Sequence, residues 1–302
     1  MRFTDAIALY SRWKSKKGKP ETARGYLGDL RIFCLWLRDR DVERVEVGDV
    51  VAFLEEMRAI GWDEGTLMRK AIALRGLFGF LRMMRHEVID PELVPVPRPD
   101  FKAPRVVAEE DLGKLVAAIP RGAADPRHVR NLAMVLMYRD SGARISELAS
   151  LDAGDLFPGS MKTAIRTEKS RGKRPFREVM WREEAEAALT SWLTRRERLA
   201  KTAPFKDAGA VFVSIGGSKH GMRITKSGIG EMLRKYSVKA GIPTVNAHSM
   251  RHKRMRDIVK AGGSAADVMN IAGHSSLASS TVYTMMFGSE LEDRYRALLG
   301  KG

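Results

Sequence analysis

A tyrosine follows a glycine–histidine pair at a fixed distance near the end of the chain. His274 comes directly after Gly273, and Tyr283 lies nine residues beyond His274. A tyrosine that attacks a phosphodiester needs cations to neutralise the phosphate and an acceptor for its proton. The pattern makes Tyr283 a candidate nucleophile; a tyrosine packed in the core with its hydroxyl bonded is the alternative.

A histidine and an arginine stand three residues apart in residues 248–252 (HSMRH). Positions i and i+3 share one face of a helix, so His248 and Arg251 could address one anion. Roughly 0.6 such pairs are expected by chance in this composition. A second pair, His220 and Arg223, is indeed present. The spacing alone therefore favours a structural histidine.

An arginine and a glutamate stand together at the start of a predicted helix. Residues 138–151 (YRDSGARISELASL) indicate a helix end, a turn at Gly142 and a new helix, with Arg144 at its start and Glu147 one turn on. A guanidinium presents a planar fork that matches two phosphate oxygens, and Glu147 could hold that fork in place. An ordinary intrahelical Arg–Glu pair is the alternative.

A basic turn joins two predicted strands, residues 162–167 and 176–181. The turn and its end carry four cationic side chains: Lys169, Arg171, Lys173 and Arg174. A lysine at the tip of such a hairpin can approach a phosphate or protonate a leaving oxygen. A solvated hairpin tip is the alternative.

Taken in order, these motifs resemble those of the tyrosine recombinase, or phage integrase, family in its two-domain, Xer-like form. Residues 141–148 (SGARISEL) resemble the box that carries the family's first arginine, and residues 248–252 resemble its His-x-x-Arg box. The first lysine of the basic turn follows Arg144 by 25 residues, and His274 follows Arg251 by 23. Both intervals fit the family's register.

The resemblance implies a role for each of these residues. Tyr283 would attack the scissile phosphate and form a 3′-phosphotyrosyl link. Arg144 and Arg251 would clamp the non-bridging oxygens. Lys169 would protonate the departing 5′-oxygen, and His248 would assist proton transfer from the tyrosine.

Two further residues complete the implied site. His274 would hydrogen-bond the phosphate, and Glu147 would brace Arg144. Neither a metal nor a cofactor is expected, because arginines supply the charge stabilisation that Mg²⁺ supplies elsewhere and the covalent link retains the energy of the broken bond.

A few positions depart from the family's pattern. The basic turn is longer by a few residues, so Lys173 competes with Lys169 as the catalytic lysine. The following strand ends in residues 177–180 (REVM) in place of Arg-x-Val-Pro, and Lys253 stands where a small hydroxyl residue is frequent. The expected DNA contacts outside the catalytic set are Arg171, Lys173, Arg174 and Lys253.

The end of the chain predicts an amphipathic helix over residues 289–300. Its apolar positions are Leu291, Tyr295, Leu298 and Leu299. Packing onto its own domain is one interpretation. The resemblance implies another, in which the helix docks into a neighbouring protomer and couples cleavage across a tetramer on DNA.

The elements that must position these residues belong to a mainly α fold with a small β-sheet, of the α+β class. We expect a helical core-binding (SAM-like) DNA-binding domain over residues 1–93, a proline-rich linker over 94–105 and a catalytic domain over 106–302. Four prolines fall between Pro95 and Pro104, which excludes a continuous helix there.

Hydrophobic periodicity gives the expected elements in more detail. The expected helices of the first domain cover residues 3–15, a segment from Pro20, 50–60 and 63–85. The expected helices of the second cover 109–118, 127–140, 144–150, 182–200 and segments from 227 onward, with a further short strand over 211–214.

Composition agrees with a nucleic-acid partner. The 302 residues carry a formal charge of +16, of which residues 1–100 contribute +2 and the remainder +14. One cysteine, Cys34, excludes an internal disulfide framework. With neither a signal peptide nor a run of about 18 apolar residues, we expect a cytoplasmic protein without a membrane span. The expected partner is double-stranded DNA.

The predicted function is site-specific DNA recombination, in which strands are cleaved and rejoined for integration, for excision as in a mobile element, or for dimer resolution. A type IB topoisomerase-like relaxation enzyme uses similar residues and is one alternative. A catalytically silent DNA-binding protein of the same fold is the other.

Overall fold

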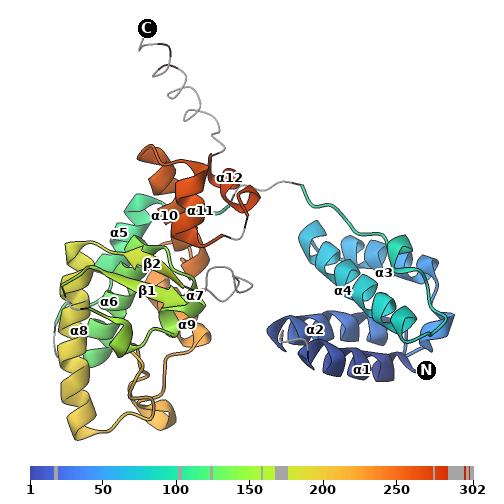
Figure 1. Cartoon of the computed structure of the whole chain (residues 1–302), viewed down its shortest axis with the longest axis horizontal. Coiled ribbons are helices and arrows are strands. Elements are labelled where there is room, and N and C mark those ends of the chain that lie inside the picture. The colour runs from blue at the N-terminus through green and yellow to red at the C-terminus, as the bar shows by residue number, and fades with distance from the viewer. Residues whose placement is uncertain are drawn as a thin grey trace. The chain divides into compact units, whose positions relative to one another are not determined.

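A computed structural model describes most of the chain. The described residues are 1–16, 20–100, 104–122, 125–157, 159–166, 176–274 and 276–284, with positions 296 and 299. The chain divides into two compact units, residues 1–102 and 103–302 (Figure 1). The boundary between the units falls within the proline-rich segment predicted over residues 94–105.

The first unit is helical. Its elements are α1 (Phe3–Lys16), α2 (Pro20–Trp36), α3 (Val47–Ala59) and α4 (Glu64–Met83), with 3₁₀ turns at Val42–Arg44 and Pro91–Leu93. Phe3 lies at the centre of the core, with its ring edge-on to Phe33 and Phe78 at centroid distances of 5.5 and 6.4 Å. All three side chains are fully buried, so burial of apolar surface contributes strongly to the packing of these helices.

The start of α3 differs from the sequence-based expectation of residue 50. The helix begins at Val47, because Asp49 lies in its first turn and accepts a hydrogen bond from the Glu46 amide at 2.9 Å. A carboxylate three residues into a helix returns a bond to the residue that precedes the helix. At the start of α4, by contrast, Asp63 is the capping residue, and its carboxylate accepts from the Thr66 amide.

The second unit surrounds a two-stranded sheet with helices. Its helices are α5 (Glu109–Ala117), α6 (Pro126–Ser141), α7 (Ile145–Ala149), α8 (Glu183–Thr202), α9 (Lys226–Lys239), α10 (Ala247–Lys260), α11 (Ala265–Ala272) and α12 (Ala278–Thr284). Strands β1 (Lys162–Arg166) and β2 (Phe176–Met180) are antiparallel, with Ala164 opposite Glu178. The predicted α+β class is confirmed, and α10, α11 and α12 cluster together in Figure 1.

The segment predicted as a strand over residues 211–214 is not one. Val211, Phe212 and Val213 are fully buried, but their backbone hydrogen bonds go to different segments and form no ladder. Val211 donates to Leu151, Phe212 accepts from Ile224, and an isolated bridge joins Val213 to a single partner. The apolar run over residues 211–213 is a connection buried in the core, which periodicity cannot distinguish from a strand.

A glycine turn brings α7 and α10 together. Gly142 ends α6 with φ of +57°, a left-handed conformation that favours glycine. A Cβ at this position would lie 2.7 Å from the Met255 side chain and 3.0 Å from that of Arg254, both on α10. Glycine therefore allows the turn before α7 to pack closely against α10.

Candidate active site

Arg144 and Glu147 form a tight pair at the start of α7. The Arg144 amide donates to Glu147 Oε2, and its Nη1 donates to Glu147 Oε1, both at 2.7 Å. Arg144 Nη2 also donates to the Gly273 carbonyl at 3.0 Å. The Glu147 side chain is buried, whereas that of Arg144 is 20% exposed. Glu147 therefore fixes a guanidinium that still reaches the surface of the site.

A second arginine binds the same carboxylate from β2. Arg177 Nη2 donates to Glu147 Oε2 at 2.7 Å, and its Nη1 donates to the carbonyl of Ile271. Its side chain is 7% exposed. The sequence assigned Arg177 no role, so the structure adds a third guanidinium to the site.

Arg251 completes the cationic cluster from α10. Its Nη1 donates to the Gly142 carbonyl at 2.8 Å and its Nη2 to the Ala272 carbonyl at 2.5 Å. The residue is buried. Arg251 thus ties the glycine turn to the end of α11.

The three arginines share one scaffold. They donate to three successive carbonyls at the C-terminal end of α11, those of residues 271, 272 and 273. These carbonyls have no partner within the helix and carry its partial negative charge. The end of α11 therefore gathers the guanidinium groups immediately before His274.

Positive charge exceeds negative charge inside this cluster. Burial would raise the pKa of Glu147, but Arg177 and Arg144 outweigh it and hold that pKa below its ordinary value. Burial, with repulsion from Arg144 and Arg177, lowers the pKa of Arg251 to about 10. One carboxylate thus faces three guanidinium groups, an imbalance that an anion would relieve.

Tyr283 and His274 lie beside the cluster. The two rings stack at a centroid distance of 6.2 Å and an angle of 15°, and Tyr283 is only 6% exposed. His274 Nδ1 shares a hydrogen bond of 2.8 Å with the Ser280 hydroxyl, which orients the imidazole. Burial, with Arg251 and Arg144, lowers the pKa of His274 to about 4, so the ring is neutral at neutral pH.

A further histidine contacts the tyrosine oxygen. His252 Nδ1 lies 2.6 Å from Tyr283 Oη, and the ring of His248 lies against that of His252 at 4.1 Å. Burial raises the pKa of Tyr283, and Arg251 and Arg144 oppose that rise. The predicted residues Arg144, Arg251, His248, His274 and Tyr283 thus come together, with Glu147 beneath them.

Other predicted residues are not part of this cluster as the structure describes it. Lys169, Arg171, Lys173 and Arg174 lie outside the described residues, as does the predicted helix over 289–300 apart from positions 296 and 299. Lys253 is described and 9% exposed, and its ammonium pairs with Glu109 at 2.5 Å and Asp257 at 2.9 Å. In this structure Lys253 joins α10 to α5 and is not presented as a surface cation.

Two residues of the site were missed by sequence reasoning, and each left a weak signal. His252 is four residues after His248, so both fall on one face of α10. Arg177 is the second residue of β2, and residues 177–180 differ from the family's Arg-x-Val-Pro pattern after that arginine. Both assignments needed the tertiary contacts with Tyr283 and Glu147.

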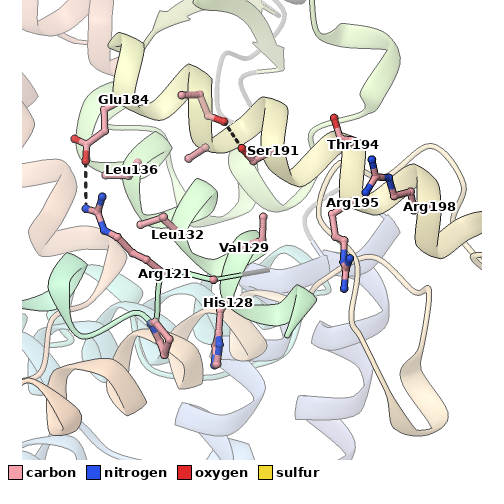
Figure 2. A pocket seen from close by; sticks show the side chains of 14 residues that line it. Arg121, His128, Val129, Leu132, Leu136, Glu184, Ser191, Thr194, Arg195 and Arg198 are labelled. Carbon is pink, nitrogen blue, oxygen red and sulfur yellow. Dashed lines mark hydrogen bonds and ion pairs between the residues drawn. The ribbon is translucent and has the colours of Figure 1, made fainter. Parts of the chain in front are cut away.

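A pocket outside this cluster lies over α6 and α8. Figure 2 shows Arg121, Arg195 and Arg198 around an apolar floor that includes Val129 and Leu132. None of the described catalytic candidates lines this pocket. This pocket is therefore separate from the arginine cluster.

The described residues also bear on metal sites and membrane spans. Within the described ranges, no three His, Cys, Asp or Glu side chains gather as metal ligands. Among the helices described for this chain, none is both long and apolar enough to cross a membrane.

Comparisons with known proteins agree with this geometry. The model of the phage integrase family matches residues 105–288, and that of the phage integrase N-terminal SAM-like domain matches residues 11–84. The chain belongs to the phage integrase family, the tyrosine recombinases. It is an enzyme of site-specific DNA recombination.

Individual relatives cover nearly the whole chain. Tyrosine recombinase XerD of Oceanobacillus iheyensis is 26% identical over 285 residues, which cover 91% of each chain. A XerH site-specific recombinase bound to palindromic difH substrate is similar in fold, with a TM-score of 0.69, 20% identity and coverage of 91% of this chain and 79% of that one. A transposon integrase in complex with circular intermediate DNA has a TM-score of 0.71 at 18% identity, covering 97% and 99%.

Proposed function

We propose that the arginine cluster holds one phosphate of duplex DNA while Tyr283 attacks it. The observation that carries this proposal is the imbalance of charge at this site, where among the described residues Arg144, Arg177 and Arg251 surround the single carboxylate of Glu147. A phosphodiester is an anion that matches planar guanidinium forks. The charge that develops on its oxygens during attack would be stabilised by donors already in place.

The proposed step is a phosphoryl transfer that conserves the number of ester bonds. Tyr283 Oη forms a bond to phosphorus as the bond from phosphorus to the 5′-oxygen breaks, which leaves a 3′-phosphotyrosyl link. The phenol loses its proton, and the departing 5′-oxygen gains one. Attack by the free 5′-hydroxyl of another strand reverses the step and joins the new partner.

Lys169 is the proposed donor of the proton to the 5′-oxygen, with Lys173 as the competing candidate. The support is their place in the basic turn between β1 and β2 and the family resemblance. His248 is proposed to assist proton transfer, His274 to hydrogen-bond the phosphate, and Glu147 to brace Arg144.

The remaining charge is proposed to attract the DNA backbone. Residues 101–302 carry +14, so affinity should fall steeply with salt as counterions are released. Arg171, Lys173 and Arg174 are the proposed backbone contacts, whereas the ion pairs of Lys253 favour a structural role for it. Because the substrate is DNA, the cytoplasm is the proposed site of action.

Self-association on paired sites is proposed to run through the segment 289–300. Its apolar residues are spaced as on one face of a helix. A helix of this kind that seats on a neighbouring protomer would link four protomers on two duplexes.

Nicked suicide duplexes test the proposed reaction. A pool with a randomised core is incubated with the protein, and covalent complexes are recovered under denaturing conditions. Wild-type protein should yield complexes and Tyr283→Phe none, whereas the control Tyr26→Phe, in the first unit, should match wild type. Strand exchange between two captured duplexes would support recombination, and relaxation without exchange would favour the topoisomerase alternative. DNA binding without any covalent complex would contradict the proposal.

A further inference from the structure

The oxygen of the proposed nucleophile has a direct contact with an imidazole. Tyr283 Oη and His252 Nδ1 lie 2.6 Å apart, although the residues are separated by 31 positions in sequence. The two rings are inclined at 41° with centroids 5.5 Å apart. This short contact joins the atom that must lose a proton to an atom that can accept one.

The tyrosine ring is held so that this contact is maintained. Tyr283 packs in a small apolar cluster with Met255, Val268 and Ala272, which come from α10 and α11. His274 stacks on its ring. His252 is on α10, the helix that also carries Arg251, so one helix positions both the imidazole and a phosphate-binding guanidinium.

We propose that His252 is the general base of the reaction, accepting the proton of Tyr283 at Nδ1 as the phenol oxygen attacks phosphorus. This inference rests on the proposed function. The proton moves from Oη to Nδ1 while the O–P bond forms, and the leaving 5′-oxygen takes its proton from the lysine of the basic turn. In the rejoining step the imidazolium returns its proton to the departing phenol.

The charges around His252 suit this role. Burial, followed by His248, Arg251 and His274, lowers the pKa of His252 to about 4, so the imidazole is neutral and can accept a proton at neutral pH. A phosphate in the cluster would offset the cationic repulsion and make imidazolium formation less unfavourable. The base would therefore become effective once DNA is bound.

The assignment changes the part played by His248. The family resemblance of residues 248–252 implies that His248 assists proton transfer from the tyrosine. The structure places His252 one turn further along α10 at hydrogen-bond distance from the phenol, with His248 packed against it. His248 then acts as a positioning residue for the imidazole of His252.

Single-turnover cleavage of the captured suicide duplex tests this role in the full chain. His252→Ala should slow covalent complex formation about 10²-fold with DNA affinity retained, and added imidazole should restore part of the rate. His252→Gln, which keeps a polar group near the phenol but no base, should be slow and insensitive to imidazole. The control His128→Gln, in the pocket over α6, should match wild type. A His252→Ala rate equal to that of wild type would overturn the assignment.

A duplex with sulfur in place of the bridging 5′-oxygen separates the two proton transfers. A thiolate leaves without protonation, so this substrate should rescue Lys169→Ala or Lys173→Ala but leave His252→Ala slow. Full rescue of His252→Ala would place His252 at the leaving group and overturn the proposal.

Nitrogen-15 NMR of histidine-labelled protein tests the contact without DNA. Tyr283→Phe should shift the Nδ1 resonance of His252, and an unchanged resonance would show that the hydrogen bond does not form and overturn the proposal. If wild-type protein captures no duplex, the proposed function is wrong, and the role of His252 in it is lost as well. Capture by wild type with an unaffected His252→Ala rate would remove only the role of His252.

Discussion

Both units of the molecule bury charged side chains, but they treat them differently. In the first unit Lys70 and Asp29 are 3% and 5% exposed and pair at 3.0 Å, with Arg69 also on Asp29. In the second unit the buried carboxylate of Glu147 serves an arginine cluster. Matched burial ties α2 to α4, whereas unmatched burial leaves cations available for an anion.

The comparison indicates what each unit's charges are for. Desolvating an ion is costly unless partners compensate for it, so a surplus of buried cations lowers stability in the absence of an anion. The surplus persists in the second unit because α11 supplies three carbonyls to hold the guanidinium groups. Folding and catalysis therefore make opposite demands on buried charge.

Removing a cation from the unmatched cluster should affect catalysis most. Arg251→Ala is expected to slow covalent complex formation about 10³-fold, because it removes a donor aimed at the phosphate, and to leave most DNA affinity intact. Single-turnover cleavage and equilibrium binding measure the two effects.

Arg196 provides a matched control in the same unit. It is also buried and donates to two backbone carbonyls, those of Ala208 and Ala210, but it takes no part in the cluster. Arg196→Ala should lower thermal stability without changing the cleavage rate of the folded fraction. If Arg251→Ala behaved in the same way, the phosphate-binding assignment would be wrong.

Removing a cation from the matched pair should affect stability instead. Lys70→Met leaves the Asp29 carboxylate buried with Arg69 alone, at an expected cost of about 3 kcal/mol in the free energy of unfolding. Arg69→Met, which removes the exposed partner, should cost about 1 kcal/mol or less. Urea unfolding of the two variants checks the difference, and equal costs would contradict the importance of burial.

Neutralising the carboxylate of the cluster should lower the stability of the second unit. Glu147→Gln is expected to lower the free energy of unfolding at pH 7 by about 2 kcal/mol, because three guanidinium groups then lack their anion. The folded-state pKa of Glu147 is lowered, so its contribution is present above the ordinary glutamate pKa of about 4.3 and lost as pH falls through the folded value.

Acid unfolding curves test this sign. Wild type should lose stability more steeply than Glu147→Gln below about pH 4.3, so the two curves should converge in acid. Glu178→Gln is the control, since its exposed carboxylate pairs with Lys162 at 3.2 Å. Parallel curves for wild type and Glu147→Gln would show that the carboxylate is not held ionised by the arginines.

The orientation of His274 should make the smallest contribution. Ser280→Ala removes the hydroxyl that bonds Nδ1, at a cost of about 1 kcal/mol, or roughly fivefold in cleavage rate. The exposed neighbour Ser279, changed to alanine, should have no effect. A Ser280→Ala rate equal to that of Ser279→Ala would show that another contact fixes the imidazole.

The sequence predicted those candidate-site residues that lie at characteristic intervals along the chain. Tyr283, His274, Arg251 and Arg144 stand at intervals that local pattern and family resemblance expose. The α+β class followed from helical periodicity and one short hairpin.

What the sequence did not predict depends on contacts between distant segments. Arg177 meets Glu147 across 30 positions, and His252 meets Tyr283 across 31. The run at 211–214 has the composition of a strand, but in the described part of the chain its strand-like pairing is limited to an isolated bridge at Val213. Lys253, predicted to contact DNA, pairs with Glu109 on α5 across more than 140 positions as well as with Asp257 on its own helix.

The central claim is that Tyr283 becomes covalently joined to a DNA phosphate. Tryptic digestion of the captured complex yields residues 261–294 as one peptide, in which Tyr283 is the single tyrosine. After nuclease treatment, mass spectrometry should find a nucleotide remnant on this peptide at Tyr283 in the wild-type protein, and on no peptide of Tyr283→Phe. A remnant on a different residue, or a captured complex that persists in Tyr283→Phe, would contradict the account.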